Sequence, residues 1–203
     1  GLQAPLAVLN VGGVANVTFW SGGDEIAAFD TGPGNGMIDL MVQARGAGRF
    51  DEGGKYASVG RVNEGVLSGL LGHPYFTAPP PKSLDRFDFS LEPIERLELE
   101  DAAATLVAFM AEGVRLGFAM MGQTPTELIV TGGGRRNPEI MKALAERLPM
   151  PVRTAEDHGW RGDSIEAEAF AYLAARTARG LPISFPKTTG VPAPMTGGRI
   201  VKT

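Results

Sequence analysis

Three glycine-rich turns are the part of this sequence best suited to chemistry. They read "LNVGGVAN", "FDTGPGN" and "VTGGGRRNP", and each follows a strand-like run; helix-like runs follow the second and third. Glycine lets the backbone approach a ligand without a Cβ in the way. A helix N-terminus adds unpaired N–H groups and about half a positive charge, which suits phosphate. The turns therefore predict a nucleotide held between them, with phosphate at the first and adenosine at the last.

The candidate nucleotide contacts share a position in these turns or directly beside them. None of the turns matches the GxxxxGK[ST] phosphate loop, so that class of nucleotide site is disfavoured. Tight turns need glycine even without a ligand, but three glycines in series cost chain entropy, which favours a ligand at the last turn. The candidates are Gly12, Gly13, Thr31, Gly32, Gly132, Gly133, Gly134 and Asn137.

The elements that must position these turns follow from hydrophobic spacing. Two strands are expected in 5–20 around the Gly12-Gly13 turn, and a third in 24–32, so the first three strands form an antiparallel meander. Helical spacing predicts helices at 34–46, 61–72, 100–121, 137–150 and 163–180, with strands at 126–131 and 151–155. The order β-β-β-α-α-α-β-α-β-α predicts an α/β fold with a ribonuclease H-like mixed sheet and helices on its faces.

Local signals set the ends of several helices. Asn35 and Asn137 are expected N-caps, and Pro138 occupies a first helical position, where a missing N–H costs nothing. Gly46 and Gly180 are expected to end their helices. The segment 73–90 holds four prolines and four aromatic residues, so we expect an ordered loop rather than a flexible linker.

Composition narrows the class of protein. The chain has 203 residues, 43% of them hydrophobic, a formal net charge of −4 and no cysteine. A disulfide framework and a cysteine metal site are excluded, and the charge argues against nucleic acid as the main partner. We expect no membrane-spanning segment, no signal peptide and a cytoplasmic location.

Five segments together resemble a known family. The segments "VLNVGGVANVT", "AFDTGPGN", "PPPKSLDRFDF", "VTGGGRRNP" and "DSIEAEAFAYLA" resemble anhydro-N-acetylmuramic acid kinases, of the actin, sugar-kinase and heat-shock ATPase superfamily. The resemblance runs from about Pro5 to near Gly198. It implies an actin-like ATPase domain in a cytoplasmic bacterial enzyme of cell-wall recycling. Such an enzyme uses Mg-ATP to phosphorylate O6 of 1,6-anhydro-N-acetylmuramic acid while water opens the anhydro ring, and it typically forms a homodimer.

The resemblance also sets an expectation about domains. Members of the family carry an N-terminal domain with a "GTSxDGxD" phosphate motif and a general-base aspartate ahead of a "GGQGAPL"-like segment. This chain opens with "GLQAPL". We therefore expect residues 1–203 to be a single C-terminal ATPase-type domain that depends on its own N-terminal domain. No catalytic residue is expected in this chain, and the isolated piece is expected to be inactive.

Further site residues rest on the same resemblance. Asp30 caps the next turn or lies near Mg²⁺ or its water shell. Glu166 belongs to a capping-box-like "DSIE", or it reaches toward the sugar. For Asn16, phosphate contact and an exposed polar face are both open. Lys82, Ser83 and Arg86 match a family block, which implies a functional or interdomain role.

Two other classes of function remain open from the residues. A non-catalytic nucleotide-binding sensor or regulatory module of the same superfamily would show the same glycine turns. A binding domain without a nucleotide would use the glycines only for tight turns. The segments "PPPKSLDRFDF" and "DSIEAEAFAYLA" favour the kinase.

Overall fold

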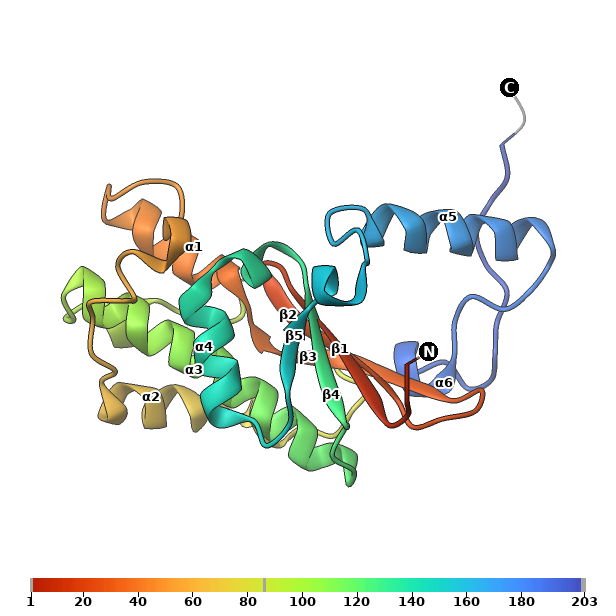
Figure 1. Cartoon of the computed structure of the whole chain (residues 1–203), viewed down its shortest axis with the longest axis horizontal. Helices are drawn as coiled ribbons and strands as arrows, with labels where there is room; N and C mark the ends of the chain where they lie inside the picture. The colour runs from red at the N-terminus through yellow and green to blue at the C-terminus, as the bar shows by residue number, and fades with distance from the viewer. Residues whose placement is uncertain (1, 86, 202–203) are drawn as a thin grey trace.

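A five-stranded mixed sheet forms the centre of the protein (Figure 1). The computed structural model describes residues 2–85 and 87–201. The spatial order is β3-β2-β1-β4-β5, with β1, β2 and β3 antiparallel and β4 and β5 parallel to β1. This is the ribonuclease H-like arrangement predicted from the sequence. The strands are β1 (Leu6–Val11), β2 (Val14–Trp20), β3 (Ile26–Pro33), β4 (Glu127–Thr131) and β5 (Val152–Thr154).

The helices follow in the predicted order, with one short addition near the end. Five of them match the expected segments, and α6 is the addition. The α-helices are α1 (Asn35–Ala44), α2 (Glu64–Leu71), α3 (Leu99–Met121), α4 (Pro138–Arg147), α5 (Ile165–Ala178) and α6 (Pro186–Thr189). Short 3-10 helices are η1 (Glu52–Gly54), η2 (Pro74–Thr77), η3 (Glu92–Ile94), η4 (Gly133–Arg136) and η5 (Ala155–His158).

The helix caps confirm one prediction and correct another. The Asn137 side chain accepts hydrogen bonds from the backbone N–H groups of Glu139 (3.0 Å) and Ile140 (3.4 Å), and Pro138 begins the helix. The expected Asn35 cap is wrong, because Gly34 is the N-cap and Asn35 is already helical. The Asn35 side chain instead donates to the carbonyl of Val11.

One face of the sheet carries the main core. Leu9, Val17 and Val130 on this face are fully buried, and they belong to one cluster with residues of α1, α2, α3 and α4. Helix α3 is long and apolar enough, by length and composition alone, to cross a bilayer, which the sequence analysis did not anticipate. However, 67% of its most apolar stretch is buried inside the protein, so the core explains its character.

The other face of the sheet is covered at one side only. Leu6 and Ile129 pack there against Ala155, with Trp160 and Ile165 at the margin. Helix α5 begins beside this cluster and then extends away from the sheet (Figure 1). None of its residues is buried. The polar side chains of this face therefore border open space over β1 and β2.

The proline-rich segment is ordered, as predicted, by an aromatic cluster. The ring of Phe109 on α3 meets Phe76 at 5.4 Å and Phe89 at 5.5 Å between centroids. Lys82 donates to the Tyr75 carbonyl at 2.7 Å and lies over the Tyr75 ring, and burial lowers the pKa of its ammonium group. This gives Lys82 a clear part in holding the loop. Arg86 lies outside the described residues.

Candidate functional site

The three glycine turns meet at one end of the sheet. The carbonyls of Gly12 and Gly13 accept hydrogen bonds from the first N–H groups of α1, which come from Gly34, Asn35 and Gly36 (2.7–3.1 Å). The third turn follows β4, which lies beside β1, and η4 contacts β1. Strand ends beside a helix start are where ligands bind in open α/β sheets. At the α1 N-terminus, however, the first N–H groups already donate to the hairpin carbonyls and are not free for a ligand.

Close packing against β1 explains why two positions of the third turn are glycine. A Cβ on Gly132 would lie 2.7 Å from the Val11 carbonyl oxygen and closer still to Asn10 Oδ1. A Cβ on Gly134 would overlap the Val11 side chain. These two glycines let the third turn lie against the end of β1, so close packing explains them without a ligand.

Three other glycines have no such reason. A Cβ on Gly13 would meet nothing within 4 Å, and on Gly12 or Gly133 it would make only ordinary contacts at 3.6 Å or more. Bare backbone that faces open space at these positions is what a ligand lying against main-chain amides requires. Gly12, Gly13 and Gly133 are therefore the strongest of the predicted glycine contacts.

Thr31 and Gly32 lie inside the protein. The register between β2 and β3 shifts beside Ala15, and Thr31 is the extra residue of this β-bulge. Its hydroxyl donates to the Ala15 carbonyl at 3.1 Å and its side chain is 1% exposed. Gly32 has a positive φ of 155° and lies against the Phe76 ring. The Thr31 side chain thus serves the core, and direct nucleotide contact by either residue stays a prediction.

A cavity of about 390 Å³ lies over the open face of the sheet. We call it the sheet-face cavity. Its floor comes from β1 and β2, one wall from the third glycine turn, and the other from the start of α5. The polar residues that line it are Asn10, Asn16, Thr18, Thr131, Arg135, Asp163 and Glu166.

Glu166 reaches this cavity without a capping role. The N-cap of α5 is Ser164, and no side-chain capping bond forms there, so the capping-box interpretation is wrong. Asp163 instead pairs with Arg135 and Arg136. The structure leaves Glu166 exposed at the edge of the sheet-face cavity, which favours the alternative that it faces a ligand.

A second cavity, of about 300 Å³, lies between α1, η1 and the start of α4. We call it the helix-side cavity. Its lining includes Asn35, Asp39, Phe50, Arg136 and Asn137, and half of the Phe50 side chain is exposed. Gly133 lines both cavities, so this bare residue lies where they meet.

Sequence reasoning missed several residues that line these cavities. Asn10 is the one polar residue of β1 and lies between buried Leu9 and Val11, so strand alternation places it on the opposite face, a signal that was available in the pattern. Arg135 follows the third glycine turn directly, yet its two carboxylate partners lie 21 and 28 residues away. No local pattern in the sequence indicates such pairing.

Asp30 is held by two structural hydrogen bonds. Its Oδ1 accepts from the Asn16 amide and its Oδ2 from the Leu84 N–H, both at 2.7 Å. Among the described residues, no group of three or more His, Cys, Asp or Glu side chains could hold a metal. The side chains around Asp30 therefore could not hold a cation without ligands from elsewhere. A role of Asp30 through metal-bound water stays a prediction.

Replacing Asp30 with alanine separates the two roles. We expect the free energy of unfolding to fall by about 1–3 kcal/mol without any metal, because the Leu84 N–H and the Asn16 amide lose their acceptor. Urea unfolding in EDTA and in Mg²⁺ measures this, with Asp24→Ala in the exposed β2–β3 turn as control. Unchanged stability in EDTA with a loss only in Mg²⁺ would contradict the structural role.

Two solved structures are similar to parts of this chain. A xylulose kinase from Bifidobacterium adolescentis gives a TM-score of 0.49 at 19% identity, over 75% of this chain and 34% of that one. The activator of a 2-hydroxyisocaproyl-CoA dehydratase from Clostridium difficile, solved with bound ADPNP, gives 0.47 at 15% identity, over 75% and 55%.

Two curated relatives are far more similar in sequence. An anhydro-N-acetylmuramic acid kinase from Phenylobacterium zucineum is 78% identical over 202 residues, covering 100% of this chain and 55% of its own length. One of the same name from Caulobacter vibrioides is 70% identical, covering 99% and 54%. The chain thus spans about half the length of the curated relatives it matches. The family model described as anhydro-N-acetylmuramic acid kinase matches residues 2–203, so the chain belongs to the anhydro-N-acetylmuramic acid kinase family.

Proposed function

We propose that this chain is the C-terminal, ATP-holding part of a kinase that acts on 1,6-anhydro-N-acetylmuramic acid. The reaction would transfer the γ-phosphoryl group of Mg-ATP to O6 while water opens the anhydro ring, giving N-acetylmuramic acid 6-phosphate. The observation that carries the proposal is the meeting of two cavities at Gly133, beside the Gly12-Gly13 hairpin. Membership of the family favours this activity over a non-catalytic sensor.

The two cavities suggest how the nucleotide would lie. Adenosine would occupy the helix-side cavity, where Phe50 offers an exposed ring and Asn137 lies at the rim. The phosphates would cross Gly133 toward Gly12 and Gly13, and the sugar would enter the sheet-face cavity beside Glu166. Phosphoryl transfer depends on positioning and on neutralising charge, so backbone amides and fixed side chains would supply most of this chain's contribution.

The remaining groups would come from another part of the kinase. We assign no general base to this chain. The open face of the sheet and the unburied helix α5 offer surfaces for a further domain, and the relatives are about twice as long as this chain. Closure of that domain over the sheet-face cavity would exclude water from the γ-phosphate. We place the enzyme in the bacterial cytoplasm, as a homodimer, with Mg²⁺ entering on the ATP phosphates.

Isothermal titration of the chain with Mg-ATP tests the nucleotide assignment. We expect Gly13→Val to lower the affinity at least about tenfold, since the new side chain would occupy the space through which phosphate approaches the backbone. Gly69→Val is the matched control, because a Cβ there also meets nothing within 4 Å but lies on α2. Equal affinities for the two variants would contradict the phosphate site at the hairpin.

A further inference from the structure

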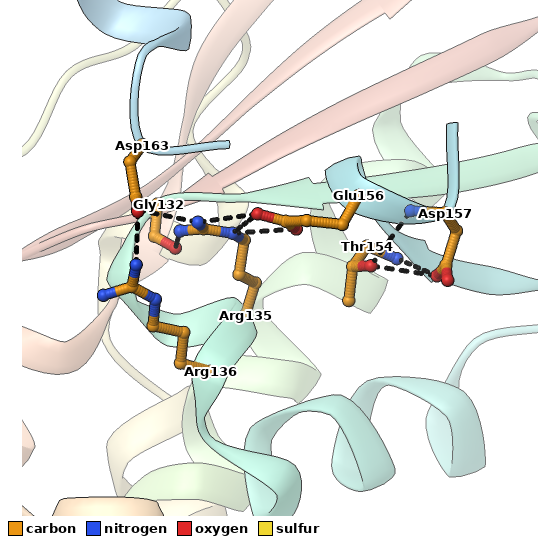
Figure 2. Close-up of polar contacts among 7 residues, drawn as sticks. All are labelled: Gly132, Arg135, Arg136, Thr154, Glu156, Asp157 and Asp163. Atoms are coloured by element: carbon orange, nitrogen blue, oxygen red, sulfur yellow. Dashed lines mark hydrogen bonds and ion pairs between the residues drawn. The ribbon is translucent and has the colours of Figure 1, made fainter. Parts of the chain in front are cut away.

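A single guanidinium group joins three separate segments beside the sheet-face cavity. The Arg135 side chain is 5% exposed. Its Nη1 donates to the Gly132 carbonyl at 2.7 Å, and its Nη2 donates to Asp163 Oδ1 at 2.7 Å. Its Nε and Nη2 also donate to the Glu156 carboxylate at 2.8–3.1 Å. Figure 2 shows Arg135 between these three partners, all of which it contacts at once.

Two of the three partners, Gly132 and Asp163, line the sheet-face cavity, and the third comes from η5. Gly132 belongs to the third glycine turn, Glu156 to η5, and Asp163 to the loop before α5. The segment that holds Glu156 is itself anchored by side-chain hydrogen bonds. Glu156 lies inside a reciprocal capping box, in which Thr154 and Asp157 exchange hydrogen bonds at 2.8–3.3 Å (Figure 2). The guanidinium therefore links the third glycine turn, η5 and the loop before α5 through one side chain, beside the Arg136–Asp163 ion pair and the apolar cluster around Ala155.

The loop before α5 lies directly on this guanidinium. A Cβ on Gly162 would be 2.5 Å from both Arg135 Nε and Glu156 Oε1, so a larger residue here would displace the ion pair. Arg136 makes a second ion pair with Asp163. The Asp163 carboxylate thus receives both arginines, three residues before Glu166.

The charges in this cluster support one another. Hydrogen bonds from Arg135 hold the pKa of Glu156 and of Asp163 below their usual values, and the Glu156 carboxylate raises the pKa of Arg135. A planar guanidinium can serve one carbonyl and two carboxylates at the same time, whereas the three donors of a lysine ammonium cannot reproduce that fork. The identity of the residue matters here, beyond its charge.

We propose that Arg135 is a positioning residue that couples the third glycine turn to the loop that leads into α5, whose first turn holds Glu166. The path runs from the Gly132 carbonyl through the guanidinium to Asp163, and from there along three residues to Glu166. Binding of a nucleotide at the turn would therefore also order the loop. The identity of the ligand rests on the proposed function, but the mechanical link between turn and loop does not.

Hydrogen exchange read by mass spectrometry tests the link on the 203-residue chain. In Arg135→Lys we expect the backbone amides of 159–168 to exchange about tenfold faster, since charge-assisted hydrogen bonds that restrain local opening are lost. In the unmodified chain, saturating Mg-ATP should slow exchange in 159–168, and this slowing should disappear in Arg135→Lys. A residue that only supports the fold would leave the ligand-dependent slowing in place.

Two further variants provide a control and an independent test of the link. Arg153→Lys is the matched control, because Arg153 pairs with Glu127 on the same side of the sheet but touches neither turn nor loop. Asp163→Ala removes the loop end of the link together with the Arg136 ion pair, and we expect the variant to fold because the Asp163 carboxylate is exposed. We expect faster exchange in 159–168 for Asp163→Ala, with the turn at 131–136 unchanged.

The outcomes separate this inference from the proposed function. Exchange in 159–168 that is the same in all variants would overturn the link, as would an increase spread evenly over the whole chain. If the unmodified chain binds no Mg-ATP, the proposed function loses its nucleotide, yet the comparison of ligand-free variants still decides whether Arg135 restrains the loop.

Discussion

Replacing Gly132 with alanine should lower the free energy of unfolding by about 3 kcal/mol or more. Gly132 has φ 74° and ψ −177°, a backbone conformation open essentially to glycine alone. The added Cβ would also lie 2.7 Å from the Val11 carbonyl oxygen, so the turn would have to leave the end of β1. Urea unfolding followed by circular dichroism measures the loss.

The neighbouring glycine supplies the control. Gly133 has no such conformation, and its Cβ would meet only the Asn35 amide at 3.6 Å. Gly133→Ala should therefore change stability by less than about 1 kcal/mol, while Mg-ATP affinity falls because the methyl group lies where the cavities meet. Equal loss of stability in the two variants would show that packing at the turn has been assigned to the wrong glycine.

Phe109→Ala should be nearly as damaging, by about 3–5 kcal/mol. Phe109 is 1% exposed on α3, and its ring holds both Phe76 and Phe89. Removing it leaves a cavity at the point where the proline-rich segment joins the core, so proteolysis within 77–90 should accelerate as well. Thermal unfolding and limited digestion provide the two measurements.

A variant on α5 gives the comparison for this core substitution. Phe170 is 65% exposed, so Phe170→Ala should change stability by less than about 0.5 kcal/mol. A large loss at Phe170 together with a small loss at Phe109 would mean that α5 is integrated into the core and that the proline-rich segment is not.

Much of the fold was predictable because its signals are local. An apolar run marks β1, β-forming residues beside a glycine turn mark β2, helical spacing marks α3, and Asn137 followed by Pro138 marks the start of α4. The prediction for Asn35 was wrong because an asparagine near the start of a helix can be either the N-cap or, as here, the first helical residue. The hairpin carbonyls already satisfy the first N–H groups of α1, which leaves a cap little to do.

The sequence alone could not show why glycine is needed at individual positions. A Cβ on Gly34 would overlap the Gly12 carbonyl, and one on Gly60 would overlap the backbone of Glu100, contacts that arise only once distant segments meet. In the same way, Arg135 could be seen beside the third glycine turn, but Glu156 and Asp163 become its partners only through the sheet. The sequence predicts a site at the glycine turns, while the tertiary structure shows which of these glycines face open space.

The two margins of the sheet bear on how the chain behaves in solution. The backbone of Asp30 in β3 donates to the Lys82 carbonyl, and the Asp30 carboxylate receives the Leu84 N–H, so the proline-rich segment shields that outer strand. At the opposite margin β5 has only three residues. Unpaired strand margins template intermolecular β-pairing, and short or shielded ones resist it. Amyloid-type assembly by strand addition is thereby discouraged at both margins.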